Sequence, residues 1–216
     1  MTYVYIISNT LNIPLSSLNK YNYLIPNWIN KQTNENIKNS SIAYLTVVYI
    51  IKKLFYIDKK ILFNKNKLGK PLIDNCNNIF FNISHTENYV ACIVSDSYDV
   101  GIDIENIKHA NKNIIKKYYS EYEVKYIYDD MHNIDYRFTK IWTMKECFVK
   151  MIGSGITSTF KYLDTKKLNY NSSYFFKTIF DEKTVCSFCM NGKDIIMYKY
   201  YDSETVLRNL ENDFRS

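Results

Sequence analysis

The alternating segment Gly101-Ile102-Asp103-Ile104-Glu105, near the middle of the chain, most constrains the fold. Successive side chains of a β-strand point to opposite faces, so Asp103 and Glu105 share one face while Ile102 and Ile104 share the other. Two carboxylates on one face repel each other unless a cation lies between them or solvent surrounds them. We therefore predict a strand whose acidic face either binds a cation that prefers oxygen ligands, such as Mg²⁺, or stays solvated at a strand end.

A long helix is predicted over residues 135–152, because apolar residues recur there with the spacing of one helix face. These residues are Ile141, Met144, Phe148, Met151 and Ile152. The other face carries Trp142, Glu146 and Lys150, which follow one another at intervals of four residues. Glu146 and Lys150 should therefore lie one above the other, about 5 to 6 Å apart at Cβ. Such a pair alone is usually a surface ion pair.

The Glu146–Lys150 pair gains a chemical role if Glu146 joins Asp103 and Glu105 as a third carboxylate on one metal ion. Lys150 would then add positive charge beside the metal. Mg²⁺ is commonly held by a few carboxylates together with waters and substrate phosphate oxygens. The combination therefore indicates phosphate chemistry, with a substrate that carries a pyrophosphate group.

A second apolar strand ends in Asn82-Ile83-Ser84-His85. The hydroxyl of Ser84 and the imidazole of His85 can both donate hydrogen bonds to phosphate oxygens. A single histidine is more often structural, but one that follows a serine at a strand end is better positioned than most to meet a ligand.

Several ordered motifs together resemble the 4'-phosphopantetheinyl transferases of the surfactin-synthetase-activating (Sfp) type. The motifs are Gly69-Lys70-Pro71, Phe81-Asn82-Ile83-Ser84-His85, Gly101-Ile102-Asp103-Ile104-Glu105, Tyr119-Ser120-x-x-Glu123, Trp142-x-x-Lys145-Glu146-x-x-x-Lys150 and Gly153-x-Gly155. They span most of the middle of the chain with compatible spacing. The match is specific because it depends on many motifs in order.

The resemblance implies an α+β fold of two similar lobes, each a small, mainly antiparallel sheet with a long helix, in a pseudo-dimer. The lobes would comprise residues 1–98 and 99–216, with coenzyme A bound in the cleft between them. No residue-level repeat between the halves is evident, so this division rests mainly on the family resemblance.

The resemblance also implies a metal and catalytic set. Asp103, Glu105 and Glu146 would hold Mg²⁺ against the pyrophosphate of coenzyme A. Glu146 would also act as the general base, directly or through a water, on the serine hydroxyl of a carrier protein. Lys150 would stabilise or protonate the departing phosphate of 3',5'-ADP. We assign no catalytic step to Lys145.

The remaining implied contacts are to the phosphates of coenzyme A. Lys70 and His85 would contact the pyrophosphate, and Ser84 would help to bind phosphate. The family commonly has basic residues before and within its long N-terminal helix, whereas residues 39–44 carry none here. Lys31 or Lys38 could substitute for them at the adenine end.

The implied reaction transfers the 4'-phosphopantetheine arm of coenzyme A to a serine of an apo acyl or peptidyl carrier protein. A formal net charge of +6 suits such acidic partners. No secretory signal is evident and the five cysteines are odd in number, so we expect reduced thiols in the cytoplasm. We expect a monomer that binds neither nucleic acid nor membrane. Cys186-x-x-Cys189 is interpreted as structural.

Two alternatives remain open. Clustered carboxylates beside a lysine are also typical of metal-dependent nucleases and phosphodiesterases, and the chain is basic. Their common pattern is Glu-x-Lys on one strand, whereas Lys108 follows Glu105 by three residues and would point to the opposite strand face. The second alternative is a non-catalytic relative that binds coenzyme A or carrier proteins.

Apolar periodicity and turn residues predict the remaining elements. Strands are expected at 2–8, 61–63, 71–73, 79–83, 89–95, 173–180, 184–190 and 194–201, and helices near Pro14 and at 41–56, 113–119 and 121–130. A Ser120-x-x-Glu123 capping box should begin the last of these helices. Gly153 is expected to end the helix over 135–152.

Overall fold

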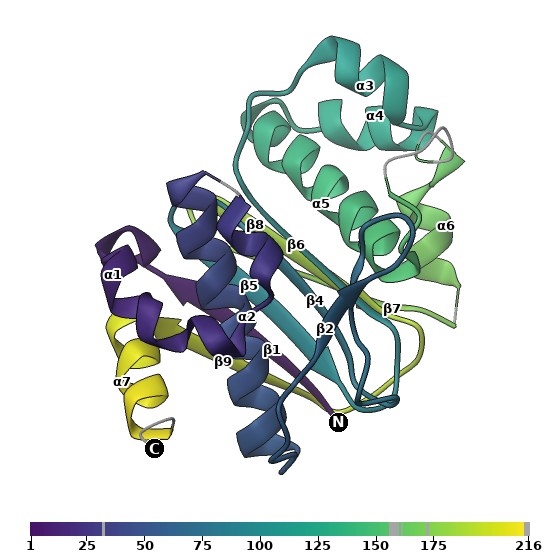
Figure 1. Cartoon of the computed structure of the whole chain (residues 1–216). Helices are drawn as coiled ribbons and strands as arrows, with labels where there is room; N and C mark the ends of the chain where they lie inside the picture. Colours follow the sequence, from purple (N-terminus) through teal and green to yellow (C-terminus); the bar gives the residue numbers. More distant parts are fainter. Residues whose placement is uncertain (32, 156–159, 161, 172, 214–216) are drawn as a thin grey trace.

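The computed structural model describes residues 1–31, 33–155, 160, 162–171 and 173–213. Within them the strands form two main sheets and a small hairpin (Figure 1). The first sheet has the order β4 (Phe80–His85), β5 (Tyr89–Ser95), β1 (Thr2–Ser8), β9 (Ile196–Asp202), and the second β6 (Val100–Asn106), β8 (Thr184–Met190), β7 (Phe175–Phe180). The hairpin consists of β2 (Phe63–Lys65) and β3 (Pro71–Ile73). Neighbouring strands are antiparallel except β1 and β9, which are parallel.

Helices cover the outer faces of both sheets (Figure 1). The helices are α1 (Leu15–Leu18), α2 (Asn34–Leu54), α3 (Lys112–Tyr118), α4 (Glu121–Tyr128), α5 (Ile134–Ile152), α6 (Thr165–Tyr170) and α7 (Ser203–Asp213). Short 3-10 turns occupy Thr10–Asn12, Asn19–Leu24, Asn27–Lys31 and Met131–Asn133. The long helix α2 packs on the first sheet, and α5 packs on the second. No helix within these described ranges combines the length and apolarity that crossing a membrane requires.

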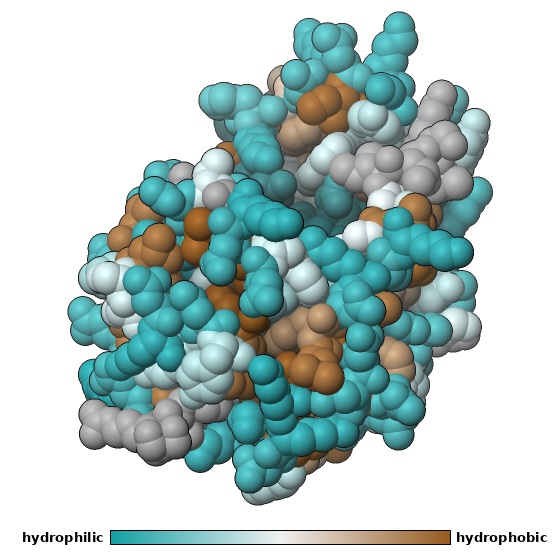
Figure 2. All heavy atoms as spheres, viewed as in Figure 1, coloured by the Kyte–Doolittle hydropathy of each residue, from teal (hydrophilic) through white to brown (hydrophobic). Residues whose placement is uncertain are grey.

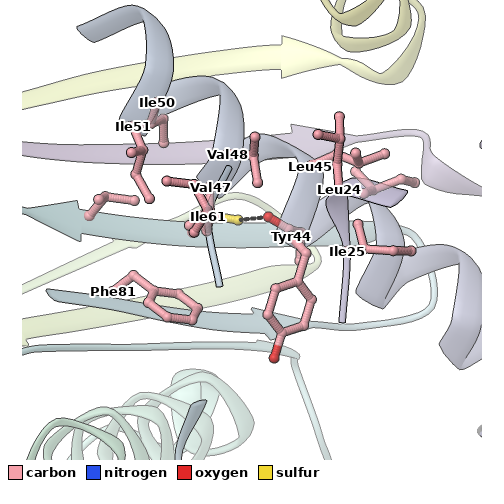
Figure 3. Close-up of a cluster of buried hydrophobic side chains, with 14 of the residues drawn as sticks. Leu24, Ile25, Tyr44, Leu45, Val47, Val48, Ile50, Ile51, Ile61 and Phe81 are labelled. Carbon is pink, nitrogen blue, oxygen red and sulfur yellow. Dashed lines mark hydrogen bonds between the residues drawn. The ribbon is translucent and has the colours of Figure 1, made fainter. Parts of the chain in front are cut away.

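The alternation of side chains along each strand divides the apolar residues between separate cores. In β1, Tyr5 and Ile7 face α2, whereas Val4 and Ile6 face the second sheet. Figure 3 shows the first of these cores, where Val48 and other apolar side chains of α2 lie over the strands and Phe81 rises from β4. This burial of apolar surface on both faces of one sheet holds α2 and the second sheet in place.

The second sheet meets α5 at Gly101 of β6. A Cβ atom at this position would lie 1.9 Å from the carbonyl oxygen of Cys147 and 2.7 Å from the amide nitrogen of Met151. Both are backbone atoms of α5, so they cannot rotate away. Glycine is therefore required for the close approach of strand and helix, and Asp103, on the same strand face, is brought beneath α5.

The expectation of an α+β fold is confirmed, and the arrangement of one long helix on each sheet is compatible with the pseudo-dimer interpretation. The C-terminal segment returns to the first sheet, because β9 pairs with β1 and Val206 and Leu210 of α7 pack in the core under α2. Figure 1 shows this segment, in yellow, beside the N-terminal one in purple. The C-terminal segment thus packs with the N-terminal sheet, and the boundary at residue 98 stays a prediction.

Most predicted elements lie within a few residues of the observed ones, and the capping box at Ser120 and the left-handed stop at Gly153 are confirmed. The predicted apolar stripe of α5 extends one residue too far, because Ile152 is 51% exposed. The two cysteines of the Cys-x-x-Cys segment lie on opposite faces of β8: Cys186 packs between the sheets, and Cys189 packs against α5. They are free and buried, which agrees with a structural role.

Candidate active site at the junction of the sheets

The edge strands β4 and β6 of the two sheets are joined by polar side chains. Asn82 of β4 accepts a hydrogen bond from the backbone N–H of Ile102 through its Oδ1 at 3.0 Å. Two residues further along β4, Ser84 Oγ donates to Asp103 Oδ1 at 2.9 Å. Both bonds are buried, so they fix the relative position of the strands where the sequence motifs meet. The joining role of Asn82 was missed by sequence reasoning, which recognised Asn82 only as part of a motif.

A lysine from α5 completes a three-residue network. Lys150 Nζ lies 2.6 Å from Asp103 Oδ1 and donates to Ser84 Oγ at 2.9 Å. Burial acts to lower the pKa of Lys150, but the carboxylates of Asp103 and Glu146 outweigh it and raise the pKa above its usual range. The ammonium therefore stays charged at neutral pH. Asp103 Oδ2 is buried and has no hydrogen-bond partner among the described residues.

Glu146, one turn before Lys150, has an unusual environment. Its side chain is only 9% exposed. Burial, and next the negative charge of Asp103, raise the pKa of Glu146 to about 7, although Lys150 opposes the shift. A carboxyl group that titrates near neutral pH can accept and release protons there, which is what a general base or acid requires.

Glu146 and Lys150 line a pocket of 260 Å³ between α5, β4 and the β2–β3 hairpin. Its other walls come from residues 68–71, from Asn82 and Ile83 of β4, and from the end of α5. The face shown in Figure 2 is largely hydrophilic, and its surface is recessed where the parts built on α2 and α5 meet. The pocket offers a polar ligand both a lysine ammonium and a carboxyl group.

Lys70 also lines this pocket, but its ammonium is engaged with the end of α5. Its Nζ donates to the carbonyl oxygen of Met151 and lies 3.8 Å from Asp99. Burial lowers the pKa of Lys70, and the charge of Asp99 partly offsets this effect. A Cβ on Gly153 would lie 3.0 Å from Lys70 Cδ, so the glycine leaves room for the lysine stem. Lys70 thus fastens the hairpin to the negative end of the helix dipole.

Glu105 pairs with a lysine that follows β6. Its Oε2 forms an ion pair of 2.8 Å with Lys108 Nζ. The prediction that Lys108 points to the opposite strand face is wrong, because β6 ends at Asn106 and the chain beyond it no longer alternates. Glu105 is not among the residues that line the pocket.

His85 follows Ser84 directly in β4, so the two side chains leave opposite faces of the strand. Ser84 faces the Asp103 network, whereas His85 does not line the pocket. The structure therefore brings together Ser84, Asp103, Glu146 and Lys150, with Lys70 at the pocket wall.

The acidic side chains of the site bear on whether it can hold Mg²⁺. In the described part of the chain, no group of three or more histidine, cysteine, aspartate or glutamate side chains is arranged to hold a metal ion. Mg²⁺ is, however, usually held by one or two carboxylates with waters and substrate phosphates. The orphaned buried oxygen of Asp103 and the neighbouring Glu146 carboxyl supply such a pair. The residues present thus fit a magnesium ion held by two carboxylates.

A second ion pair lies behind the site, on the α4 side of α5. Lys145 Nζ is 2.8 Å from Glu123 Oε2, and neither side chain is exposed. Glu123 also accepts from the backbone N–H groups of Ser120 and Thr165, so one carboxylate ties together α4, α5 and α6. Burial lowers the pKa of Lys145, and Glu123 opposes this shift. The capping box gave the only sequence signal for Glu123, and nothing in the sequence predicted its partner.

Comparison with known proteins identifies relatives of part of the chain. Residues 99–198 match the family described as the 4'-phosphopantetheinyl transferase superfamily. A 4'-phosphopantetheinyl transferase named gsp, from Aneurinibacillus migulanus, is 38% identical over 109 residues, which cover 50% of this chain and 45% of the relative. The 4'-phosphopantetheinyl transferase Sfp of Bacillus subtilis (strain 168) is 34% identical over 126 residues, which cover 57% of this chain and 55% of the relative.

A eukaryotic relative is the L-aminoadipate-semialdehyde dehydrogenase-phosphopantetheinyl transferase of Saccharomyces cerevisiae (strain ATCC 204508 / S288c). It is 29% identical over 124 residues, which cover 52% of this chain and 44% of the relative. The chain thus spans about half the length of the curated relatives it matches.

The fold and site therefore define an α+β protein with a pocket between β4, the β2–β3 hairpin and α5 that contains one glutamate and two lysines. Residues 99–198, which carry Asp103, Glu146 and Lys150, are similar to the 4'-phosphopantetheinyl transferase superfamily, whose family model they match. The resemblance inferred from the motifs is confirmed.

Proposed function

We propose that this protein transfers the 4'-phosphopantetheine arm of coenzyme A to a serine of an apo acyl or peptidyl carrier protein, releasing 3',5'-ADP. The observation that carries the proposal is the pocket at the sheet junction. There a carboxyl group with a pKa of about 7 and a charged lysine face the same 260 Å³ space, within the segment that matches the transferase superfamily. The names of the gsp and Sfp relatives add support.

Glu146 is proposed to act as the general base. At neutral pH about half of this group is ionised, so its carboxylate can take the proton of the carrier serine hydroxyl. The serine oxygen then bonds to the β-phosphorus of coenzyme A, and the bond between that phosphorus and the bridging oxygen breaks. The electron pair leaves with 3',5'-ADP.

Lys150 is proposed to stabilise this leaving group. Its ammonium lines the pocket and stays charged because of the neighbouring carboxylates. A positive charge near the phosphate oxygens offsets the negative charge that develops as the bond breaks. Ser84 and Asp103 hold the ammonium in position, at 2.9 and 2.6 Å.

Mg²⁺ is the proposed cofactor, with Asp103 and Glu146 as ligands and Glu105 as a third if it exchanges Lys108 for the metal. When bound, Mg²⁺ supplies positive charge against the pyrophosphate oxygens of coenzyme A. Asp103 Oδ2 would find in the metal the partner that it lacks among the described residues.

The remaining phosphate contacts are proposals too. Lys70 could donate to the pyrophosphate from the pocket wall by exchanging its contact with the α5 carbonyl. Ser84 would assist as a hydroxyl donor beside Lys150. His85 is proposed to meet the pyrophosphate from the end of β4.

The proposed partners are an acidic carrier protein and coenzyme A, with the protein acting as a monomer in the cytoplasm. The net charge of +6 supports attraction to an acidic carrier surface. We propose no nucleic-acid or membrane partner. The ion pair between Glu105 and Lys108 leaves that lysine outside the pocket, so the nuclease alternative gains no support from it.

Intact-mass spectrometry tests the proposal. Apo acyl and peptidyl carrier proteins would be incubated with the protein, coenzyme A and Mg²⁺. We expect a mass gain of one phosphopantetheine that disappears with a chelator. Lys150→Gln should abolish the gain, whereas the matched control Lys116→Gln, an exposed lysine on α3, should not change it. No mass gain on any carrier, despite measured coenzyme A binding, would favour a non-catalytic relative. Absence of coenzyme A binding would instead favour the nuclease alternative.

A further inference from the structure

A second cavity opens at one end of the sandwich, where β1 and β9 end and β8 begins. It measures 340 Å³ and has walls from both main sheets. It shares no lining residue with the pocket that contains Glu146 and Lys150. Ile104 of β6 lines it, whereas the neighbouring Asp103 leaves the other face of the same strand, toward α5. The cavity and the candidate active site are therefore separate spaces on opposite sides of β6.

The cavity exists because a small side chain replaces a large one at this end of the sheets. Deeper between the sheets, the rings of Phe188 and Tyr198 lie 5.8 Å apart and fill the space. Two residues nearer the end of each strand, Cys186 and Tyr200 occupy the corresponding positions on the same faces. Cys186 is small, and Tyr200 is 64% exposed. The inner space thus stays unfilled behind an exposed aromatic ring.

The charge of this cavity is opposite to that of the whole protein. Asp181 and Asp202 line it, and among its described lining residues there is no lysine, arginine or histidine. The chain as a whole carries a net charge of +6. Tyr89, also in the lining, donates to Asp181 Oδ2 at 3.3 Å. Such a local reversal of charge favours a positively charged ligand over an anionic one.

The two carboxylates are ionised at neutral pH. Burial acts to raise the pKa of Asp181, but hydrogen bonds from the backbone N–H groups of Lys183 and Thr184 lower it overall. The backbone N–H of Thr205 lowers the pKa of Asp202, which it meets at 2.7 Å. Each carboxylate keeps lone pairs for a further donor, because it accepts these bonds mainly through one oxygen.

We propose that this cavity binds a small aliphatic amine. Its ammonium groups would lie between Asp181 and Asp202 and over the faces of the tyrosine rings, where a cation is attracted by the ring electrons. Its alkyl chain would pack against Ile104 and Ile179 on the inner wall. A cavity of this size, mostly apolar with a few convergent polar groups, is typical of small-molecule sites.

Calorimetric titration with spermidine tests the proposal. We expect saturable binding with one molecule per chain and no binding of an uncharged diol of similar length. The double variant Asp181→Asn/Asp202→Asn keeps the side-chain oxygens that accept backbone hydrogen bonds and removes both charges. It should weaken spermidine binding at least about tenfold, the size expected for lost charge-assisted hydrogen bonds.

Two further variants sharpen the test. Cys186→Phe fills the cavity without changing its charge and should also abolish binding. Asp164→Asn is the matched control, because Asp164 likewise accepts backbone hydrogen bonds at the start of a helix, α6, and does not line the cavity. It should bind like the wild type. The proposal is overturned if spermidine does not bind saturably, or if the double variant and Cys186→Phe both bind it with unchanged affinity. Neither outcome depends on transferase activity, since no carrier protein or coenzyme A is present.

Discussion

Lys145 and Glu123 form an ion pair of 2.8 Å in which neither side chain is exposed to solvent. Lys145 is adjacent in sequence to Glu146 and yet lies on the other side of α5, among α4, the start of α6 and aromatic rings such as that of Tyr119. The pair thus holds together the helices that cover the second sheet, whereas Glu146 faces the pocket.

Replacement of Lys145 should therefore reduce stability. Lys145→Met leaves the Glu123 carboxylate buried without its countercharge, and breaking a buried pair from one side typically costs about 3 to 5 kcal/mol. Urea unfolding would measure this loss as a lower midpoint. The control Lys140→Met, on the same helix, removes a partly exposed lysine and should cost less than about 1 kcal/mol. Equal effects of the two changes would contradict the structural role of the pair.

Asp103→Ala should abolish Mg²⁺-dependent turnover. The change removes the orphaned oxygen proposed for the metal and the carboxylate that holds Lys150. We expect a rate loss on the order of a hundredfold or more. We expect Mg²⁺ to stabilise the wild type against thermal unfolding and not to stabilise the variant, and this second readout is independent of activity. An undiminished rate would remove the assignment of Asp103 to the metal.

Glu146→Gln should reduce the rate far more than the affinity for coenzyme A. The amide keeps the shape of the side chain but cannot take a proton, so a loss of about 10²- to 10⁴-fold in rate is expected. The affinity for coenzyme A should change only a few-fold. Single-turnover mass spectrometry and calorimetry measure the two quantities separately, with Glu121→Gln, an exposed residue of α4, as the control. Parallel losses of rate and affinity would indicate a structural role.

The raised pKa of Glu146 also predicts how stability depends on pH. The pKa of Glu146 is about 7 in the folded protein, against 4.5 for an ordinary glutamate, so folding takes up a proton between these values. The free energy of unfolding must then fall as pH rises from about 4.5 to about 7, by up to about 3 kcal/mol from this group, and level off above. Glu146→Gln lacks this titration.

Denaturant unfolding of wild type and Glu146→Gln at a series of pH values isolates the contribution of this one group. The stability of the variant relative to the wild type should rise as the pH increases from about 5 to about 8. A difference that stays constant over this range would mean that Glu146 ionises at an ordinary pKa in the folded protein.

Most of the secondary structure could be predicted from the sequence, and the differences between the predicted and the observed bounds have physical causes. The bounds of β1 and β8 were predicted as observed, because alternating or continuous apolar residues end there at polar ones. Helix α2 begins at Asn34, whereas the sequence predicted a start near residue 41. The prediction began too late because the first residues of the helix include asparagines and serines, which have low helix propensity. Tertiary contacts support that turn of helix, including the bond from Asn39 Nδ2 to the carbonyl oxygen of Thr86. Helices α6 and α7 were not predicted.

The site was readable in part. The sequence placed Asp103 and Glu105 on one strand face and Glu146 above Lys150 on one helix face, because these relations depend only on local periodicity. It could not place Glu105 with Lys108, since that contact depends on where β6 ends.

The sequence by itself determined the elements, the acidic and basic faces they carry, and the similarity of residues 99–198 to the transferase superfamily. Only the tertiary structure decided which of these faces meet. Lys150 contacts Asp103, although the two residues are 47 positions apart in the sequence. Likewise, β9 near the end of the chain pairs with β1 at its start. Such contacts depend on the packing of two sheets and their helices around shared cores, and no local pattern encodes that packing.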